Sequence, residues 1–177
     1  MKKRIFTLCL LIILSIGVFP ITATAGSLDN FQKTRTYPNR FTDVSSSQWY
    51  APSIKEVYEY GLMLGYSDDE FGPNKQIIIA EAVTIAARLH SIYWTGDDDI
   101  PFPPKGIWYD GYVNYAKENN IISETDLDYN RYATRAEFAN ILAKALPVTA
   151  LSSINSIQSG AIPDVPLDSD YAVHTYL

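Results

Sequence analysis

The residue whose side chain is best suited to bind a ligand is Arg135, which follows Thr134 at the start of a predicted helix. A guanidinium group is a planar fork that holds a carboxylate with two hydrogen bonds. The first turn of a helix adds free backbone N–H groups and the positive end of the helix dipole. Thr134 and Glu137 have the spacing of a capping box, which would fix where this helix begins. On these residues alone, an anion contact and a solvated Arg135 paired with Glu137 or Asp128 are equally supported.

Aromatic and acidic residues next to predicted helices and turns could bind a sugar. Trp49 and Trp108 open two helices and could stack on sugar rings, but a Trp at such a place more often packs in the core, and we favour the core. Tyr66 and Asp68 lie in a Gly-rich loop and could contact sugar hydroxyls, while Asp68 could equally make an Asx turn. Asp43 could bond a ligand or, as we favour, cap the segment that follows it.

Other site chemistries find little support in the sequence. Asp97–Asp99 lacks the alternating spacing and the Gly and Glu of a calcium loop, so an acidic turn in solvent is expected. The two histidines, His90 and His174, form no metal-binding pair and no Ser-His-Asp arrangement. No cofactor is expected. A net charge of −6 argues against nucleic acid and requires that an anionic ligand be held by well-placed local cations.

The N-terminus has the three parts of a secretory signal peptide. Lys2, Lys3 and Arg4 precede an apolar run from Ile5 to Phe19, and Ala23-Thr24-Ala25 supplies the small residues of a cleavage site. We therefore expect residues 1–25 to be removed, with an uncleaved anchor as the alternative. The remaining chain would have no cysteine, no membrane segment, and a location outside the cell, at the wall or surface.

The elements that position these residues repeat along the chain. Aromatic helix starts at Trp49, Trp108 and Tyr171 recur about every 60 residues, which is typical of stacked or pseudo-symmetric units. Each unit has an opening, a first helix ended by Gly61 or by Asn119-Asn120, a loop and a second helix. The predicted organisation is a linker at 26–40, repeat 1 at 41–95, repeat 2 at 96–147, a linker at 148–160 and a partial repeat 3 at 161–177.

These motifs resemble the S-layer homology family. Its usual unit has a Phe-x-Asp-Val opening, a Trp-Tyr or Trp-Ala helix start, a Gly-Tyr-x-Asp loop and a Thr-Arg-Ala-Glu helix start. Repeat 1 supplies Phe41, Asp43, Val44, Trp49, Gly65, Tyr66, Asp68, Phe71 and Pro73, and repeat 2 supplies Trp108-Tyr109 and Thr134-Arg135-Ala136-Glu137. Repeat 1 departs from the family with Ile78-Ile79 before Ala80-Glu81. Repeat 2 departs from it with Phe102 in place of the Asp and with a changed loop.

The resemblance implies a mainly α fold in which three helix-loop-helix repeats form a pseudo-threefold bundle, here with an incomplete third repeat. It implies a non-catalytic module that binds an acidic or pyruvylated secondary cell wall polysaccharide in grooves between repeats. The residues it marks are Arg135, Thr134, Glu137, Trp108, Asp43, Trp49, Tyr66 and Asp68. Two alternatives stay open: a structural repeat protein that associates with itself or with other surface proteins, and a small glycan hydrolase using two carboxylates.

Overall fold

The structure is a computed structural model that describes residues 25–123, 127–150, 158, 160 and 161. Within these residues the regular elements are α2 (Ala51–Glu59), α3 (Ile79–Thr95), α4 (Asp110–Glu118), α5 (Arg135–Ala143) and the 3-10 turns η1 (Leu28–Asn30) and η2 (Val148–Ala150). The only β-type pairing in the described part is a single antiparallel bridge between Ile78 and Tyr132. The predicted mainly α fold is therefore confirmed.

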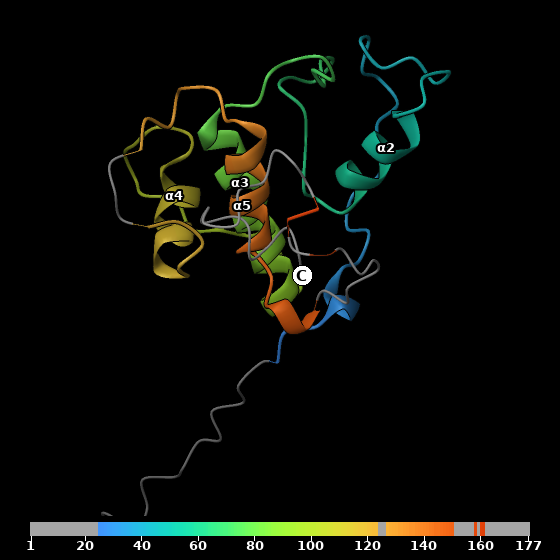
Figure 1. Ribbon diagram of the computed structural model, residues 1–177. Coiled ribbons are helices and arrows are strands. Elements are labelled where there is room, and N and C mark those ends of the chain that lie inside the picture. The colour runs from blue at the N-terminus through green and yellow to red at the C-terminus, as the bar shows by residue number, and fades with distance from the viewer. Residues whose placement is uncertain (1–24, 124–126, 151–157, 159, 162–177) are drawn as a thin grey trace, which may run out of the picture.

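The helices follow the predicted order, with α2, a loop and α3 followed by α4, a loop and α5 (Figure 1). The expected third repeat falls almost entirely on residues outside the described part. The pseudo-threefold bundle therefore stays a prediction, and the structure describes two helix-loop-helix units.

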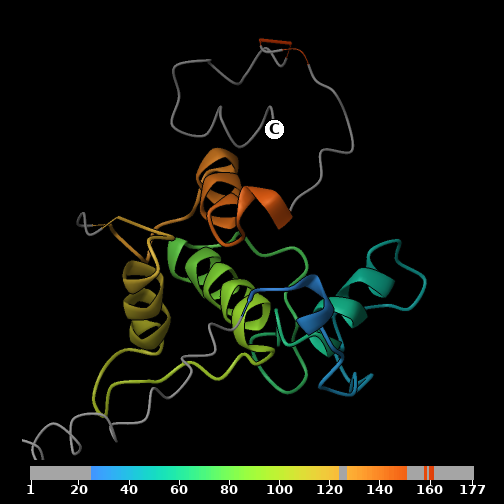
Figure 2. The same ribbon diagram turned by 90° about the horizontal axis from the view of Figure 1, so that it is seen from below.

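Helix α3 is the centre of the molecule and packs against both α4 and α5 (Figures 1 and 2). Its apolar residues belong to the main core, which also takes in residues from both neighbouring helices. The core residues are Ile79, Ala80, Ala82, Val83, Ala86, Tyr109, Val113, Ala116, Ile121, Ile122, Ile141 and Ala145. Because α3 is packed on several sides, it is apolar around most of its circumference and has only a narrow polar face. The small alanines let the neighbouring helices approach closely.

Helix α2 belongs to a second, smaller core on one side of the molecule (Figure 1). Its centre is formed by Phe41, Ile54 and Phe71, and the rings of Phe41 and Phe71 meet edge to face with centroids 5.5 Å apart. Phe41 comes from the opening of repeat 1 and Phe71 from its loop. The opening, the first helix and the loop of repeat 1 are thus held together by one aromatic cluster.

The predicted helix ends are largely confirmed. Gly61 after α2 and Asn120 after α4 both have left-handed backbones, with φ of 77° and 58°, the conformation that ends helices at such positions. Thr134 and Glu137 form the predicted capping box at the start of α5. Helix α3 runs further than the sequence pattern indicated, because apolar residues continue to Tyr93 and Gly96 ends it with φ of 78°.

Residues 26–40, expected to form a linker, are tied to the ends of α2 and α3. The backbone N–H of Ser27 donates to the carbonyl of Tyr93 at 3.0 Å. The guanidinium of Arg35 pairs with Asp98 at 2.6 Å, in the acidic turn that follows α3. This segment therefore runs as a strap from the end of α3 back to the opening of repeat 1.

Candidate ligand-binding site

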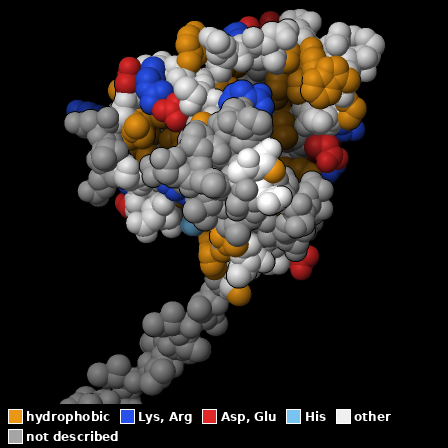
Figure 3. Space-filling view, in the orientation of Figure 1, with side chains coloured by type: hydrophobic (Ala, Val, Ile, Leu, Met, Phe, Trp, Pro, Cys, Tyr) orange, Lys and Arg blue, Asp and Glu red, His pale blue; other side chains and the backbone are white. Residues whose placement is uncertain are grey.

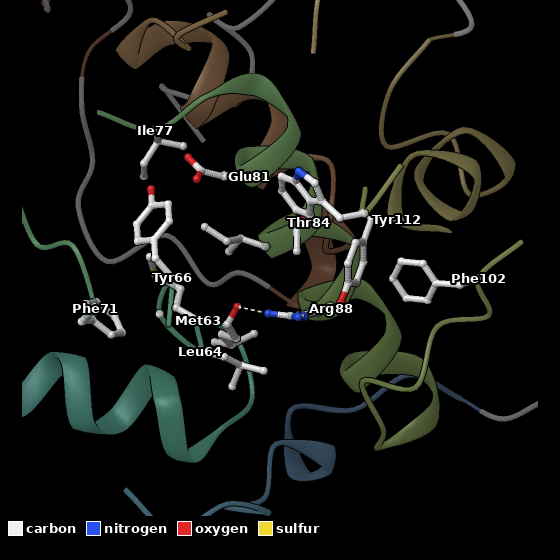
Figure 4. Close-up of a pocket in the computed structure, with 14 residues that line it drawn as sticks. Met63, Leu64, Tyr66, Phe71, Ile77, Glu81, Thr84, Arg88, Phe102 and Tyr112 are labelled. Carbon is white, nitrogen blue, oxygen red and sulfur yellow. Dashed lines mark hydrogen bonds between the residues drawn. The ribbon is translucent and has the colours of Figure 1, made fainter. Parts of the chain in front are cut away.

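A pocket of about 420 Å³ lies where the two units meet. One wall comes from the loop of repeat 1 and from α3, and the facing wall comes from the opening and first helix of repeat 2 (Figure 4). The lining residues are Leu62, Met63, Leu64, Gly65, Tyr66, Phe71, Ile77, Glu81, Thr84, Ile85, Arg88, Phe102, Trp108 and Tyr112. In the space-filling view, hydrophobic side chains are visible inside the recess beside the α2 region (Figure 3). The pocket is therefore an inter-repeat groove with aromatic walls.

The two Trp residues of the helix starts are exposed, so the favoured placement in the core is wrong. Trp49 is 87% exposed and Trp108 is 52% exposed. In both units the ring of the following Tyr meets the indole edge to face, with centroids 5.6 Å apart for Trp49–Tyr50 and 5.3 Å for Trp108–Tyr109. Both Tyr residues are more buried than their Trp neighbours and turn toward the two apolar clusters. Consecutive side chains at a turn cannot both point inward, and the Tyr rings take the inner places.

Only one of these Trp residues contributes to the pocket. Trp108 lines it, together with Tyr66 and Phe102, which are both about half exposed. Flat aromatic faces with polar tips suit a sugar ring, because the ring's C–H face stacks on them while its hydroxyls reach polar groups at the edge. Trp49 does not line the pocket, so the two equivalent residues have different surroundings.

One end of the pocket carries a carboxylate and a phenol. Glu81 is fixed by accepting a hydrogen bond from the backbone N–H of Ile78 at 2.9 Å. The hydroxyl of Tyr66 donates to this carboxylate, and burial together with Glu81 raises the pKa of Tyr66 to about 12. The ammonium of Lys75 lies 4.1 Å from the Tyr66 ring centroid. This end therefore offers oxygen acceptors to ligand hydroxyls.

The other end of the pocket carries Arg88, which the sequence pattern does not distinguish from other charged residues of a helix. Its Nη1 donates to the carbonyl of Leu62 at 3.3 Å, and its Nη2 donates to the hydroxyl of Tyr112 at 2.6 Å. Its guanidinium also lies 5.0 Å from the centroid of the Tyr112 ring. The helical spacing of Arg88 from Glu81, seven positions along α3, was the one available signal that both face the same side.

Asp43 braces the loop of repeat 1. Its two carboxylate oxygens accept hydrogen bonds from the backbone N–H groups of Phe71 at 2.9 Å and Gly72 at 2.6 Å. Burial opposes its ionisation, but these two bonds, together with its own backbone N–H and the charge of Lys75, outweigh burial, so the pKa of Asp43 lies below its ordinary value. The favoured role as a cap of the segment that follows it is therefore wrong, because its partners lie in the distant loop.

Asp68 lies at the tip of the same loop and not in the pocket. Its carboxylate pairs with the guanidinium of Arg40 at 2.7 Å and is otherwise exposed to solvent. The turn within the loop is made instead by Ser67, whose hydroxyl donates to Asp69 at 2.7 Å and accepts from the backbone N–H of Glu70 at 3.1 Å. The Asx-turn role considered for Asp68 is not what the structure shows.

The start of α5 is a second polar centre, separate from the pocket. Glu137 accepts from the backbone N–H of Thr134 at 2.9 Å and pairs with both Nη atoms of Arg131. Arg131 and the Thr134 bond together lower the pKa of Glu137 to about 2. The cation paired with Glu137 is thus Arg131 and not Arg135. Arg135 is exposed, and no hydrogen bond or ion pair of its side chain is found among the described residues.

Within the described residues, no group of His, Cys, Asp and Glu could hold a metal ion. The turn at Asp97–Asp99 is closed by its own bonds, with the N–H of Asp99 donating to Asp97 at 3.1 Å. None of the helices in the described part is long and apolar enough to cross a lipid bilayer. The predicted signal peptide lies at residues 1–25, of which only Ala25 is described.

Part of the chain is similar to a known protein family. Residues 40–83 match the S-layer homology domain family. This range holds the opening, first helix and loop of repeat 1 and the start of α3, including Tyr66 and Glu81 on one wall of the pocket. This stretch is therefore similar to the S-layer homology domain family, as the motifs of repeat 1 predicted. No solved structure gives a significant match.

Three similar proteins are a middle cell wall protein of Brevibacillus brevis, a surface-layer 125 kDa protein of Lysinibacillus sphaericus and an endoglucanase of a Bacillus species. Their identities to this chain are 27%, 29% and 27%, over 76%, 67% and 81% of its length. The chain spans only 12%, 11% and 15% of those proteins. Together with the family match, these similarities indicate a protein of the bacterial cell surface.

Proposed function

We propose that this chain is a non-catalytic module that anchors to the cell wall by binding a secondary cell wall polysaccharide in the pocket between its two repeats. The observation that carries the proposal is the half-exposed Trp108, which faces a pocket with a carboxylate at one end and a guanidinium at the other. Such a pocket can stack one sugar ring and hydrogen-bond its edges. The S-layer homology match over residues 40–83 supports the same function.

Arg135 remains a proposed contact for the same polymer at a different place. It lies at the first position of α5, outside the residues that line the pocket. A cation beside the positive end of a helix dipole is unfavourable by about 0.3–1 kcal/mol. A free cation at such a position is better explained by an anionic partner than by helix stability. Thr134 and Glu137 would act indirectly, by fixing the helix start that presents Arg135.

A hydrolase is less well supported by the same pocket. Glycan hydrolysis with a general acid and a second carboxylate needs two carboxyl groups that flank one bond. Glu81 is the single carboxylate among the described residues that line this pocket. The similarity to an endoglucanase covers 15% of that protein, so it carries no catalytic assignment to this chain.

The test compares the two equivalent Trp residues. Purified secondary cell wall polysaccharide from a Gram-positive bacterium is titrated into wild type, Trp108→Ala and Trp49→Ala by isothermal calorimetry. Loss of an aromatic anchor from a binding pocket typically costs about 2 kcal/mol or more, or roughly thirtyfold in affinity. We expect that loss for Trp108→Ala and an affinity within about twofold of wild type for Trp49→Ala.

Both residues are exposed and follow the same turn, so Trp49→Ala controls for loss of a surface indole. Circular dichroism of each variant checks that the helices are retained. If folded Trp108→Ala binds the polysaccharide as tightly as wild type does, the pocket is not the binding site. If wild type itself binds none, the anchoring function is wrong for this chain.

A further inference from the structure

The pocket has a single cation on its wall, and this cation does not come from the helix-start motif. Among the described lining residues, Arg88 is the only Lys or Arg. The position in repeat 1 that matches Arg135 is Ile79, which is 1% exposed and belongs to the main core. An anionic group that enters this pocket therefore meets one cation among the described lining residues, and this cation lies well inside α3 and not at its first turn.

The guanidinium of Arg88 is already held in place before any ligand arrives. Its two terminal nitrogens are bound to the Leu62 carbonyl on one wall and to the Tyr112 hydroxyl on the other. A guanidinium has five N–H donors, so these two bonds leave others free. Nε is buried and has no hydrogen-bond partner among the described residues. Because these bonds already orient the guanidinium, little further side-chain entropy is lost when it binds a planar acceptor such as a carboxylate.

The two charged groups of the pocket are well separated. Glu81 and Arg88 lie seven positions apart on α3, which corresponds to about 10 Å along the helix axis. Thr84 lies between them on the wall (Figure 4), and Ile85 and Trp108 also line the pocket. A carboxylate placed near Glu81 would be repelled, and one placed near Arg88 would be attracted. The distance between Glu81 and Arg88 along α3 suits one sugar ring with a substituent.

We propose that Arg88 binds a carboxylate carried by a sugar of the wall polysaccharide, while Glu81 and Tyr66 receive hydroxyl groups of that sugar at the other end. This assignment rests on the polysaccharide binding proposed above. The pocket then accepts the acidic sugar in one direction only, with its ring on Trp108. Repeat 1 thus supplies the counter-charge from Arg88, inside α3. The first residue of that helix is Ile79 and not the arginine of the usual motif.

The experiment uses purified wall polysaccharide in two forms, intact and with its carboxyl groups chemically reduced to alcohols. Both forms are titrated into wild type, Arg88→Gln, Arg88→Lys and Lys144→Gln. Lys144 is the matched control, because it follows Thr134 in α5 at the spacing by which Arg88 follows Ile78, and it does not line the pocket. Loss of a charge-assisted hydrogen bond predicts that wild type binds the intact form about tenfold to a hundredfold more tightly.

Arg88→Gln should bind the two forms with equal affinity, close to that of wild type for the reduced form. Lys144→Gln should keep the full preference of wild type. Arg88→Lys should keep only part of it, because a point charge does not replace a fork. The Lys variant also covers the case in which Arg88→Gln, having lost two tertiary hydrogen bonds, does not fold.

The outcomes separate this assignment from the anchoring function. Equal binding of both forms by wild type, or an undiminished preference in Arg88→Gln or Arg88→Lys, overturns the role of Arg88 while leaving polysaccharide binding intact. A preference lost in Lys144→Gln and kept in the Arg88 variants moves the carboxylate to α5. Absence of binding of either form by wild type removes the proposed function itself.

Discussion

Replacing Ile79 by arginine would bring repeat 1 closer to the usual helix-start motif, and the structure predicts that it would strongly destabilise the protein. At the start of a helix, an arginine could add an anion contact in the first repeat. Ile79 is 1% exposed, however, and its backbone N–H donates to the carbonyl of Arg131 at 3.0 Å. The segment that precedes α5 covers this position, so a longer charged side chain has no route to solvent without displacing it.

The expected cost can be worked from this burial. Removing a fully buried Ile side chain forfeits about 1.5–3 kcal/mol of apolar burial. An unpaired buried charge adds several kcal/mol more. Ile79→Arg should therefore lower the free energy of unfolding by more than about 4 kcal/mol, which approaches the lower end of the 5–15 kcal/mol typical of a domain. Ile79→Val removes one methylene and should cost only about 0.5–1.5 kcal/mol.

The matched substitution is Arg135→Ile at the equivalent position of α5. Arg135 is exposed, so this change should alter the free energy of unfolding by no more than about 0.5 kcal/mol. Urea unfolding followed by circular dichroism measures all three variants. If the free energy of unfolding of Ile79→Arg were within about 1 kcal/mol of wild type, Ile79 would not be part of the core. Position 79 could then present a cation to a ligand, and Arg88 would no longer be singled out as the counter-charge of repeat 1.

Two further predictions concern the carboxylates that hold backbone N–H groups. Asp43→Ala should cost about 1–3 kcal/mol and speed hydrogen exchange at the amides of Phe71 and Gly72, with Asp43→Asn intermediate; unchanged exchange would contradict the bracing role. Glu137→Gln should cost at most about 1 kcal/mol at pH 7, because its pair with Arg131 is partly exposed. Since folding lowers the pKa of Glu137 from 4.5 to about 2, this contribution is present above pH 4.5 and lost as pH falls toward 2. Urea unfolding at pH 7 and pH 2.5 should show the difference between the two proteins shrinking, and a constant difference would refute the assignment.

The parts of the fold that the sequence predicted correctly are those decided by local rules. Gly61 and Asn120 end helices because few other residues adopt a left-handed backbone. Thr134 and Glu137 form a capping box because both partners lie within one turn. The order of helices and loops followed from the same signals. These features depend on neighbours a few residues away, which a sequence displays directly.

The misassigned residues are those whose role depends on a partner far along the chain. Trp49 and Trp108 are apolar and stand at helix starts, but which of two adjacent aromatic rings turns inward is decided by the core that receives it. Asp43 has its partners about 28 residues away in the loop. Arg88 resembles any charged residue of an amphipathic helix until the opening of repeat 2 is placed against it. No local pattern carries this information.

The differences between the two repeats become consistent once these distant contacts are considered together. In repeat 1, Asp43 is needed because the loop turns sharply at Gly72, whose φ of 80° directs its N–H at the carboxylate. Repeat 2 has a different loop and carries Phe102 in place of the aspartate. Phe102 instead meets Tyr112 edge to face, with centroids 4.9 Å apart, on the wall of the pocket. The same opening segment thus braces its own loop in repeat 1 and lines the groove against the neighbouring unit in repeat 2. A groove between repeats needs both kinds of unit, so the departures of each repeat from the usual motif are understood as adaptation to its place beside the other.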